Sequence, residues 1–164
     1  MLRVLPRRPI FRLSLSGGLT RSERTLLVKT VVLTGESSLE EIRQLECIYL
    51  ANRDCGQELS LGLLADLPER REPISQGDRD LIRRMVSAFH ELNQRYDGRF
   101  FLLFRPPVYQ SRQGTFVGWE RKRGALLELA RMLRSRRSTI EVYSGDRTRL
   151  NGVKYLVTLD SDTD

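Results

Sequence analysis

Residues 100–104 of this chain read FFLLF, an unbroken run of large apolar side chains. A run this short and this apolar is typical of a β-strand in a parallel sheet that helices cover on both faces. Asp97-Gly98, just before the run, suits the end of a helix, and Arg105-Pro106-Pro107, just after it, interrupts the strand. The FFLLF run therefore predicts a central strand of an α/β fold.

Strand and helix patterns alternate on both sides of this run. Apolar and β-branched runs predict further strands over residues 25–33, 58–65 and 153–159, and allow an extra short strand over 139–143. Apolar residues at helical spacing predict helices over residues 37–52 and 119–133. A third helix follows the polar loop through Pro73 and has an apolar face over 81–96. This alternation predicts a three-layer α/β sandwich with a mostly parallel sheet and right-handed crossovers.

The start of the first predicted helix carries two overlapping capping motifs. Ser37 with Glu40, and Ser38 with Glu41, each have the spacing at which a hydroxyl and a carboxylate satisfy the free amides of a helix N-terminus. The sequence therefore predicts that a capping box starts this helix. Lys29 is the one charged residue in the strand before it, where the pattern otherwise indicates burial.

The composition limits the class of protein. With 164 residues, 40% hydrophobic and 30% charged, the chain suits one folded domain with a core, which excludes a disulfide mini-protein and a disordered polycation. The longest apolar run is 100–104, far below the roughly 20 residues that a membrane span needs. The N-terminus lacks the apolar core of a secretory signal. We therefore expect a soluble chain with no transmembrane segment.

The net charge of +7 is concentrated in two segments. Residues 1–24 hold six arginines and one glutamate, and residues 121–137 hold seven basic residues and one glutamate, so the rest of the chain is mildly acidic. Arginine accounts for 25 of the 28 basic residues, which favours bidentate contacts with phosphate or carboxylate groups. Scattered proline and glycine without a periodic pattern predict that 1–24 is a basic arm ahead of a domain over 25–164.

Acidic side chains follow two of the predicted strands. Asp66 comes after the strand over 58–65, and Asp160 and Asp162 come after the strand over 153–159. Open α/β sheets bind ligands beyond the carboxyl ends of their strands. The oxygen ligands of an Asp-x-Asp pair suit Mg²⁺ or Mn²⁺, which would neutralise charge on a diphosphate leaving group. The alternative is that these residues are only a polar segment after a core strand.

Three cations gather at the start of the helix predicted over 119–133, in the segment GWERKRG at 118–124. A helix N-terminus already favours anions, and neighbouring cations strengthen that preference. Consecutive helical residues point about 100° apart, so only some of the three can face one site, and Arg121 and Lys122 are the candidates. Trp119 would stack on a sugar or base, or pack beneath the sheet. A solvated helix face is the alternative for the whole cluster.

Six segments occur in one order along the chain: RTLLV at 24–28, QLECIYLANRD at 44–54, LGLLADLPE at 61–69, RFFLLFR at 99–105, GWERKRGALLEL at 118–129 and GVKYLVTLDSDTD at 152–164. Together they resemble the glycosyltransferase domain of cyclic β-1,2-glucan synthases, glycosyltransferase family 84. The resemblance extends over residues 24–164. It implies the N-terminal, nucleotide-sugar-binding half of a GT-A-type fold, and metal-dependent transfer of glucose from UDP-glucose to β-1,2-glucan with inversion at the anomeric carbon.

This resemblance implies a role for each candidate site residue. Asp160 and Asp162 match the metal-binding Asp-x-Asp, which would hold Mg²⁺ or Mn²⁺. Asp160 would also contact the nucleotide sugar. Asp66 matches the acidic residue that contacts the uridine. Lys122, with Arg121 beside it, stands where a basic residue holds the diphosphate.

The resemblance also implies what surrounds this segment in the intact enzyme. The family continues into an acceptor-binding half that contains the general base, so we expect no catalytic residue in this chain and no activity from it alone. The expected partners are UDP-glucose and a growing β-glucan acceptor, not nucleic acid. The family's domain lies at the cytoplasmic face of the bacterial inner membrane, in a very large protein with a phosphorylase-like module. An exposed sheet edge would favour a homodimer of the fragment.

Two other classes stay open at this point. A strand followed by Asp-x-Asp is also the signature of haloacid-dehalogenase-type phosphotransferases, in which Asp160 would attack phosphorus and Asp162 would act as acid and base. That class needs Thr or Val at the position of Asp164, and a further Rossmann domain. A non-enzymatic basic module would bind nucleic acid or anionic lipid through 1–24 and 121–137, although these segments have few aromatic residues.

Overall fold

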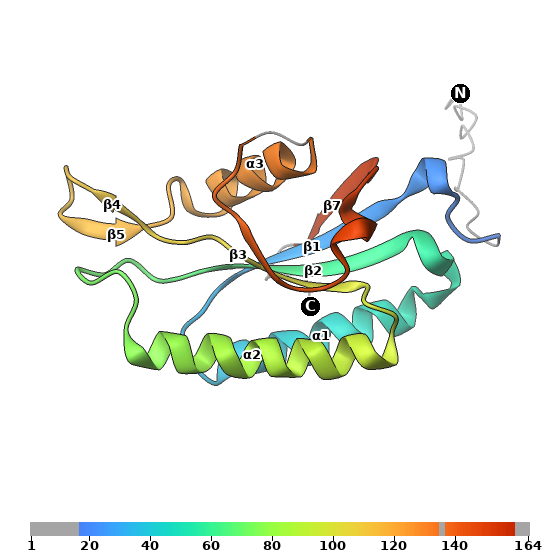
Figure 1. The fold of residues 1–164 in the computed structure, drawn as a ribbon, viewed down its shortest axis with the longest axis horizontal. Coiled ribbons are helices and arrows are strands. Elements are labelled where there is room, and N and C mark those ends of the chain that lie inside the picture. The colour runs from blue at the N-terminus through green and yellow to red at the C-terminus, as the bar shows by residue number, and fades with distance from the viewer. Residues whose placement is uncertain (1–16, 135–136, 160–164) are drawn as a thin grey trace, which may run out of the picture.

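A five-stranded sheet is the middle layer of the computed structural model, which describes residues 17–134 and 137–159 (Figure 1). In spatial order its strands are β6 (Glu141–Ser144), β3 (Phe100–Phe104), β2 (Leu59–Asp66), β1 (Thr25–Val32) and β7 (Tyr155–Leu159). Neighbouring strands are parallel except β6, which runs antiparallel to β3. The predicted mostly parallel sheet is therefore confirmed, and the extra short strand lies at its edge.

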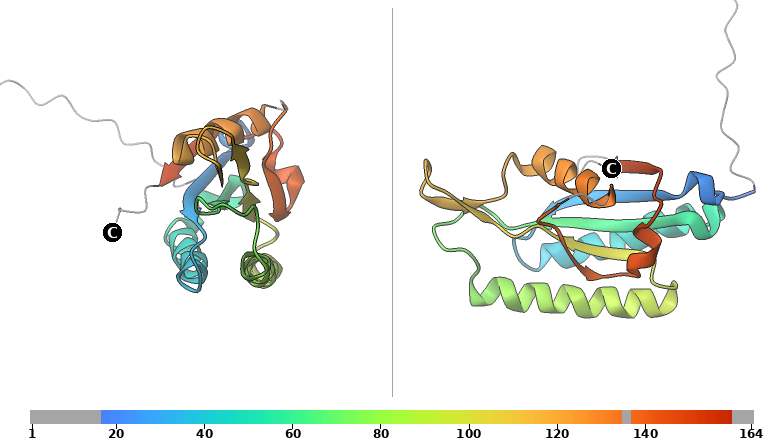
Figure 2. Two further views of the ribbon diagram at one scale, coloured as in Figure 1. Left: turned by 90° about the vertical axis from the view of Figure 1, so that its left-hand side faces the viewer. Right: turned by 45° about the horizontal axis from the view of Figure 1, so that its top comes forward.

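Helices cover both faces of the sheet. On one face lie α1 (Ser37–Ala51) and α2 (Gln76–Arg95), and on the other lies α3 (Arg121–Leu133), as the end-on view shows (Figure 2). The predicted three-layer sandwich is thus confirmed. The start of α3 differs from the prediction by two residues, since it begins at Arg121, whereas α2 begins five residues before its predicted apolar face over 81–96.

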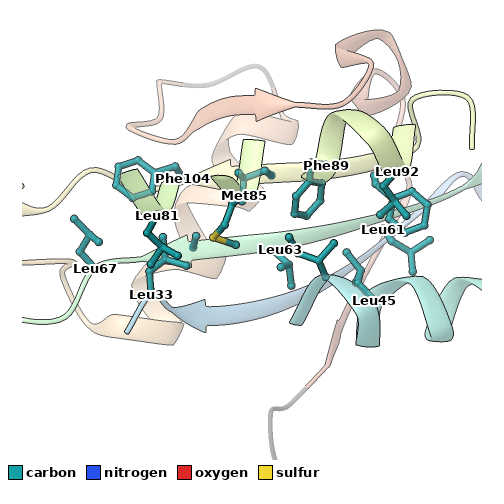
Figure 3. Close-up of a cluster of buried hydrophobic side chains, with 14 of the residues drawn as sticks. Leu33, Leu45, Leu61, Leu63, Leu67, Leu81, Met85, Phe89, Leu92 and Phe104 are labelled. Carbon is teal, nitrogen blue, oxygen red and sulfur yellow. The ribbon is translucent and has the colours of Figure 1, made fainter. Parts of the chain in front are cut away.

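The FFLLF strand, β3, separates two hydrophobic clusters. Phe100, Leu102 and Phe104 pack in the cluster beneath α1 and α2, together with side chains such as Met85 and Phe89 of α2 (Figure 3). Phe101 and Leu103 point to the opposite face and pack in the cluster beneath α3. All five side chains of β3 are buried, which is the two-faced burial that the sequence predicted.

The capping boxes predicted for α1 are wrong. The N-cap position is Glu36, which has helical dihedral angles and makes no side-chain cap, and the Ser38 hydroxyl accepts a hydrogen bond from the Thr34 amide at 3.2 Å instead. Glu41 is unavailable for capping because its carboxylate forms an ion pair with Lys29. A capping box does form at the start of α2, between Ser75 and Asp78.

A small hairpin stands where the sequence indicated only a loop. Its strands are β4 (Val108–Gln110) and β5 (Thr115–Val117), and it projects beyond the carboxyl end of β3 (Figure 1). Phe116 exchanges two backbone hydrogen bonds with Arg70, at 2.7 and 3.1 Å, which ties the hairpin to the loop after β2. The hairpin therefore forms one wall of the space beyond the carboxyl ends of the strands.

The order of the parallel strands fixes where a ligand can enter. The chain builds β1, β2 and β3 outward in one direction and then returns to place β7 on the other side of β1. The strand order thus reverses between β1 and β7, and sheets of this kind bind ligands at the carboxyl ends beside such a reversal. β7 ends at Leu159, in register with Lys29, whereas β1 continues to Val32.

Residues 1–16 of the predicted basic arm lie outside the described residues. The described remainder of that segment contacts the domain: the Leu19 amide donates to the carbonyl of Cys55 at 2.7 Å, and Arg24 forms an ion pair with Glu58. Among the described residues, no helix combines the length and the apolar character needed to cross a membrane.

Candidate functional site

A cavity of about 500 Å³ lies at the carboxyl ends of β1 and β2, next to the reversal of strand order between β1 and β7. We call it the switch-point cavity. Its walls are the ends of these two strands, the loop after β2, the start of α1 and the segment that opens α3. Three of the predicted site residues, Asp66, Arg121 and Lys122, line it together. The other two, Asp160 and Asp162, lie outside the described residues.

Asp66 is the last residue of β2, and its carboxylate forms a bidentate pair with Arg105. The Nε of Arg105 donates to Oδ1 at 2.7 Å, and Nη2 donates to Oδ2. Both residues are buried. A planar guanidinium matches a carboxylate in this geometry, so the pair fixes the direction in which the carboxylate points. Each carboxylate oxygen keeps a second lone pair with which it can accept a hydrogen bond from a ligand.

Arg105 also holds the segment that opens α3. Its Nη1 donates to the carbonyl of Trp119 at 2.8 Å, and its Nη2 donates to the carbonyl of Arg121 at 2.9 Å. One buried side chain therefore links the end of β2 to the start of α3 across the sheet edge. In the sequence pattern, Arg105 marks only the end of a strand. The feature that points to a further role is a cation directly after a fully buried apolar strand.

The GWERKRG segment is tightly packed around this arginine. A Cβ on Gly118 would lie 2.2 Å from Nη2 of Arg105, and a Cβ on Gly124 would lie 1.8 Å from the Trp119 carbonyl oxygen. Glu120 and Arg121 adopt left-handed backbone conformations, with φ of 47° and 40°. Non-glycine residues seldom adopt such conformations unless the surroundings impose them. The segment is therefore a fixed turn.

Two of the three cations of this turn line the cavity, although the Arg121 side chain is as exposed as that of Arg123 and lies 4.0 Å from the Glu69 carboxylate. Arg121 and Lys122 line the switch-point cavity, whereas Arg123 does not and instead lies 3.4 Å from the carboxylate of Glu120. The first turn of α3 contains no acidic residue. The positive end of the helix dipole and these two cations together make this wall of the cavity attractive to an anion.

Lys29 places a second charge beside the cavity. Although it lies in β1 and is buried, its ammonium group contacts the carboxylate of Glu41 at 2.7 Å and donates to the Gln44 side chain at 2.7 Å. Glu41 lines the switch-point cavity. The interruption that Lys29 makes in the apolar pattern of its strand is thus explained by the charged partner that α1 provides.

Within residues 17–134 and 137–159, no group of three or more His, Cys, Asp or Glu side chains is arranged to hold a metal ion. The predicted metal ligands, Asp160 and Asp162, lie outside that part. Their carboxylates are oxygen donors of the kind that Mg²⁺ and Mn²⁺ prefer, so the donor chemistry fits the predicted metal.

Comparison with known proteins gives one informative match. No model of a known protein family matches the chain. A cyclic beta-(1,2)-glucan synthase, NdvB of Rhizobium meliloti (strain 1021), is 37% identical over 151 residues, which cover 89% of this chain and 5% of that protein. The chain therefore spans only a short stretch of the relative. Over nearly its whole length, this chain is thus similar to part of a cyclic β-(1,2)-glucan synthase, and the resemblance indicated by its sequence is confirmed.

Proposed function

We propose that this chain forms the UDP-glucose-binding part of a glycosyltransferase that builds β-1,2-glucan. The observation that supports this best is the switch-point cavity, where Asp66 and the cations Arg121 and Lys122 converge at the carboxyl ends of the strands. The 37% identity to a cyclic β-(1,2)-glucan synthase supports a glycosyltransferase and a β-1,2-glucan product.

Each wall of the cavity suits one part of the donor. Lys122 and Arg121, at the N-terminal end of α3, would bind the diphosphate through charge-assisted hydrogen bonds. Asp66, held in direction by Arg105, would accept a hydrogen bond from the uracil N–H. The fixed turn between Gly118 and Gly124 keeps the cations in place before the donor arrives, which lowers the cost of ordering them.

Asp160 and Asp162 would hold Mg²⁺ or Mn²⁺, which when bound neutralises the negative charge that develops on the departing diphosphate. Inversion at the anomeric carbon also needs a general base on the acceptor side. Because the chain spans 5% of the relative it matches, we propose that the base comes from the remainder of such a protein. We accordingly expect this chain alone to bind the donor without transferring glucose.

We expect no nucleic-acid partner. Two of the cations in the segment 121–137 have carboxylate partners on their own helix: Arg123 lies 3.4 Å from Glu120, and Arg131 lies 2.6 Å from Glu128. This pairing reduces the charge that the helix offers to a phosphate backbone.

Calorimetric titration of the 164-residue chain with UDP-glucose tests the proposal. We expect binding that Mn²⁺ strengthens and a chelator weakens, and we expect Asp162→Ala to abolish the effect of Mn²⁺. Lys122→Ala should weaken binding about tenfold or more, because it removes a charge-assisted hydrogen bond.

The matched control is Arg123→Ala, which removes the neighbouring cation on the solvent side of the same helix turn. It should leave donor affinity unchanged within about twofold. Equal losses in the two variants would mean that general charge, not the switch-point cavity, attracts the ligand. A folded chain without metal-dependent binding would contradict the proposal.

A further inference from the structure

Trp119, the single tryptophan of the chain, is half exposed to solvent, with 49% of its surface accessible. The sequence left open whether this ring packs beneath the sheet, and the structure excludes that arrangement. Tryptophan buries more apolar surface than any other side chain when it is packed, so leaving its ring in water forgoes a large stabilisation.

The backbone that carries this exposed ring is held rigidly. The Trp119 carbonyl accepts a hydrogen bond from the buried Arg105 at 2.8 Å, and the next two residues, Glu120 and Arg121, are both left-handed. Gly124 lies so close to the same carbonyl that no side chain would fit there. The fold therefore fixes the position of an indole ring that contributes little to its core. Rigid support beneath an exposed aromatic ring is the arrangement that a binding site requires.

A second cavity, of about 390 Å³, lies beside this ring between the β4–β5 hairpin and the start of α3. We call it the hairpin cavity. Its volume falls within the range of small-molecule sites, about 300–1,000 Å³. It shares a wall with the switch-point cavity, because Glu69, Val117, Gly118 and Arg121 line both. A ligand in the hairpin cavity would therefore lie next to a ligand in the switch-point cavity.

The side chains of the hairpin cavity favour a neutral, hydroxyl-rich ligand. Gln110 and Gln113 contribute amide groups, which both donate and accept hydrogen bonds, and Arg112 contributes further donors. Within the described part of the chain, these three side chains make no hydrogen bond or ion pair of their own. Glu69 and Glu120 add two carboxylates. Glu69 already accepts from the Thr115 hydroxyl at 2.8 Å and Glu120 pairs with Arg123, but each carboxylate keeps lone pairs that can accept from a sugar hydroxyl.

A pyranose ring has an apolar C–H face and a rim of hydroxyl groups. The apolar face fits against the indole of Trp119, and the hydroxyl groups fit the amides and carboxylates around it. A nucleobase would also stack on the indole, but it has no rim of hydroxyl groups to use these acceptors. The combination of one exposed ring and several unengaged polar side chains therefore favours a sugar.

We propose that the hairpin cavity is a subsite for the growing glucan, in which a glucose ring stacks on Trp119 beside the bound donor. The identity of the ligand as a β-glucan rests on the proposed function. The cavity accepts a neutral sugar chain, and the switch-point cavity accepts the anionic donor. The shared wall at Gly118 and Arg121 brings the two substrates together.

Titration of the 164-residue chain with a linear β-1,2-gluco-oligosaccharide tests this proposal. Because Trp119 is the sole tryptophan, its fluorescence reports directly on the ring. We expect saturable binding that changes this emission. By calorimetry, Trp119→Ala should weaken oligosaccharide binding about tenfold, and Trp119→Phe should restore part of the affinity. Thermal unfolding of each variant establishes that it is folded.

The control variant is Leu127→Ala, which removes a side chain of similar exposure, 41%, from the adjoining helix α3 but away from both cavities. It should leave oligosaccharide binding unchanged. UDP with Mn²⁺ should bind Trp119→Ala as well as it binds the unaltered chain. If oligosaccharide binds but UDP does not, the glucan subsite stands and the donor proposal fails.

Three outcomes would overturn the subsite. The first is a chain that binds UDP with Mn²⁺ but no oligosaccharide, which would leave the donor proposal intact. The second is equal oligosaccharide binding by the unaltered chain and Trp119→Ala. The third is a loss of UDP affinity in Trp119→Ala as large as the loss of oligosaccharide affinity, which would assign the ring to the nucleobase instead.

Discussion

The pair formed by Asp66 and Arg105 joins residues that lie 39 positions apart in the chain. The pair has two structural roles. It orients a carboxylate that lines the switch-point cavity, and its arginine is hydrogen-bonded to the turn that carries the cavity's cations. Because both charges are buried, neither can turn to water if its partner is lost.

We expect Arg105→Ala to lower the free energy of unfolding by about 3–5 kcal/mol, because it leaves the Asp66 charge buried without a partner. Urea unfolding followed by circular dichroism measures this loss. In the double variant Asp66→Leu with Arg105→Met, no buried charge remains, so part of the stability should return. The turn at the start of α3 would still lack its two hydrogen bonds from Arg105, so donor binding should not return.

The comparison variant is Arg83→Ala, which breaks the ion pair between Arg83 and Asp80 on the surface of α2. Both of its side chains are largely exposed, so the loss should stay below about 1 kcal/mol. If the two arginine variants lower the free energy of unfolding by the same amount, burial does not explain the contribution of the Asp66–Arg105 pair to stability.

The sequence alone placed Asp66 at a strand end but did not identify its partner. The position of Asp66 follows from local pattern, since an acidic residue directly after an apolar strand lies at the carboxyl edge of the sheet. The pairing with Arg105 depends on β2 and β3 being neighbours in register, with Ala65 opposite Phe104. That register is set by tertiary structure, so the spacing of residues along the sequence does not predict it.

Tyr143 gives the fold a sensitivity to strongly alkaline conditions. Its ring stacks on Phe104 with centroids 5.3 Å apart, and burial, with a smaller contribution from Glu141, raises the pKa of its hydroxyl from 10.0 to about 12. The folded state therefore holds this proton more tightly than the unfolded chain does. The stability that this provides is complete below about pH 10 and is lost as the pH rises towards 12.

We expect tyrosinate absorbance of the folded chain to show a late step near pH 12, absent from the unfolded chain. Tyr143→Phe should remove that step and flatten the dependence of stability on pH between 10 and 12. If the late step in absorbance persists in Tyr143→Phe, another tyrosine is responsible for it.

At the scale of elements, the helices and central strands follow from local pattern, and the parts around the cavities do not. The strands β1, β2 and β3 lie within a residue or two of their predicted ranges, because apolar runs of strand length need no distant partner to be identified. The β4–β5 hairpin was predicted as a loop, since its strands are three residues long and depend on backbone bonds to Arg70. The predicted start of α3 is two residues too early, because Glu120 and Arg121, at the beginning of this helix, are left-handed.

Gly124 provides a test of this turn. Helix propensity alone predicts that Gly124→Ala, inside α3, should stabilise the chain. The structure predicts the opposite, a loss of about 1–3 kcal/mol, because the new Cβ would collide with the Trp119 carbonyl. Urea unfolding shows whether the substitution raises or lowers the free energy of unfolding.

Gly77→Ala is the matched control. Gly77 also lies in a helix, near the start of α2, and a Cβ there would meet only the Ser75 hydroxyl at 3.8 Å, an ordinary contact. It should leave stability unchanged or raise it by up to about 1 kcal/mol. If both variants raise the free energy of unfolding, the turn before α3 can shift to accommodate the new Cβ without loss of stability.

At the scale of the molecule, one edge of the sheet exposes apolar side chains among the described residues. β7 is an edge strand, and Tyr155 and Val157, which point to the face opposite the Leu156 side chain, are 56% and 43% exposed. An edge strand with exposed apolar side chains and unpaired backbone groups is a template for pairing with another strand. We propose that two copies of this chain pair through β7.

We expect sedimentation velocity to show a dimer whose fraction rises with concentration. Replacing Tyr155 and Val157 together by lysine should shift the chain to monomer, because charges on an edge strand oppose pairing. Leu50→Lys alters an apolar side chain of similar exposure, 46%, at the end of α1, and it should leave the dimer intact. A monomer at every concentration would contradict pairing through β7.

The pair formed by Lys29 and Glu41 has a consequence for the order in which the chain folds. Its members are twelve positions apart, from β1 to the first turns of α1, so bringing them together closes a short loop. A bare ammonium group could not enter the middle of an apolar sheet on its own. We therefore expect the first strand to pack with α1 before, or while, its neighbours β2 and β7 assemble against it. We accordingly expect the unit formed by β1 and α1 to nucleate folding. Pairing of β1 with β7, the last strand in the described part of the chain, is expected to come late.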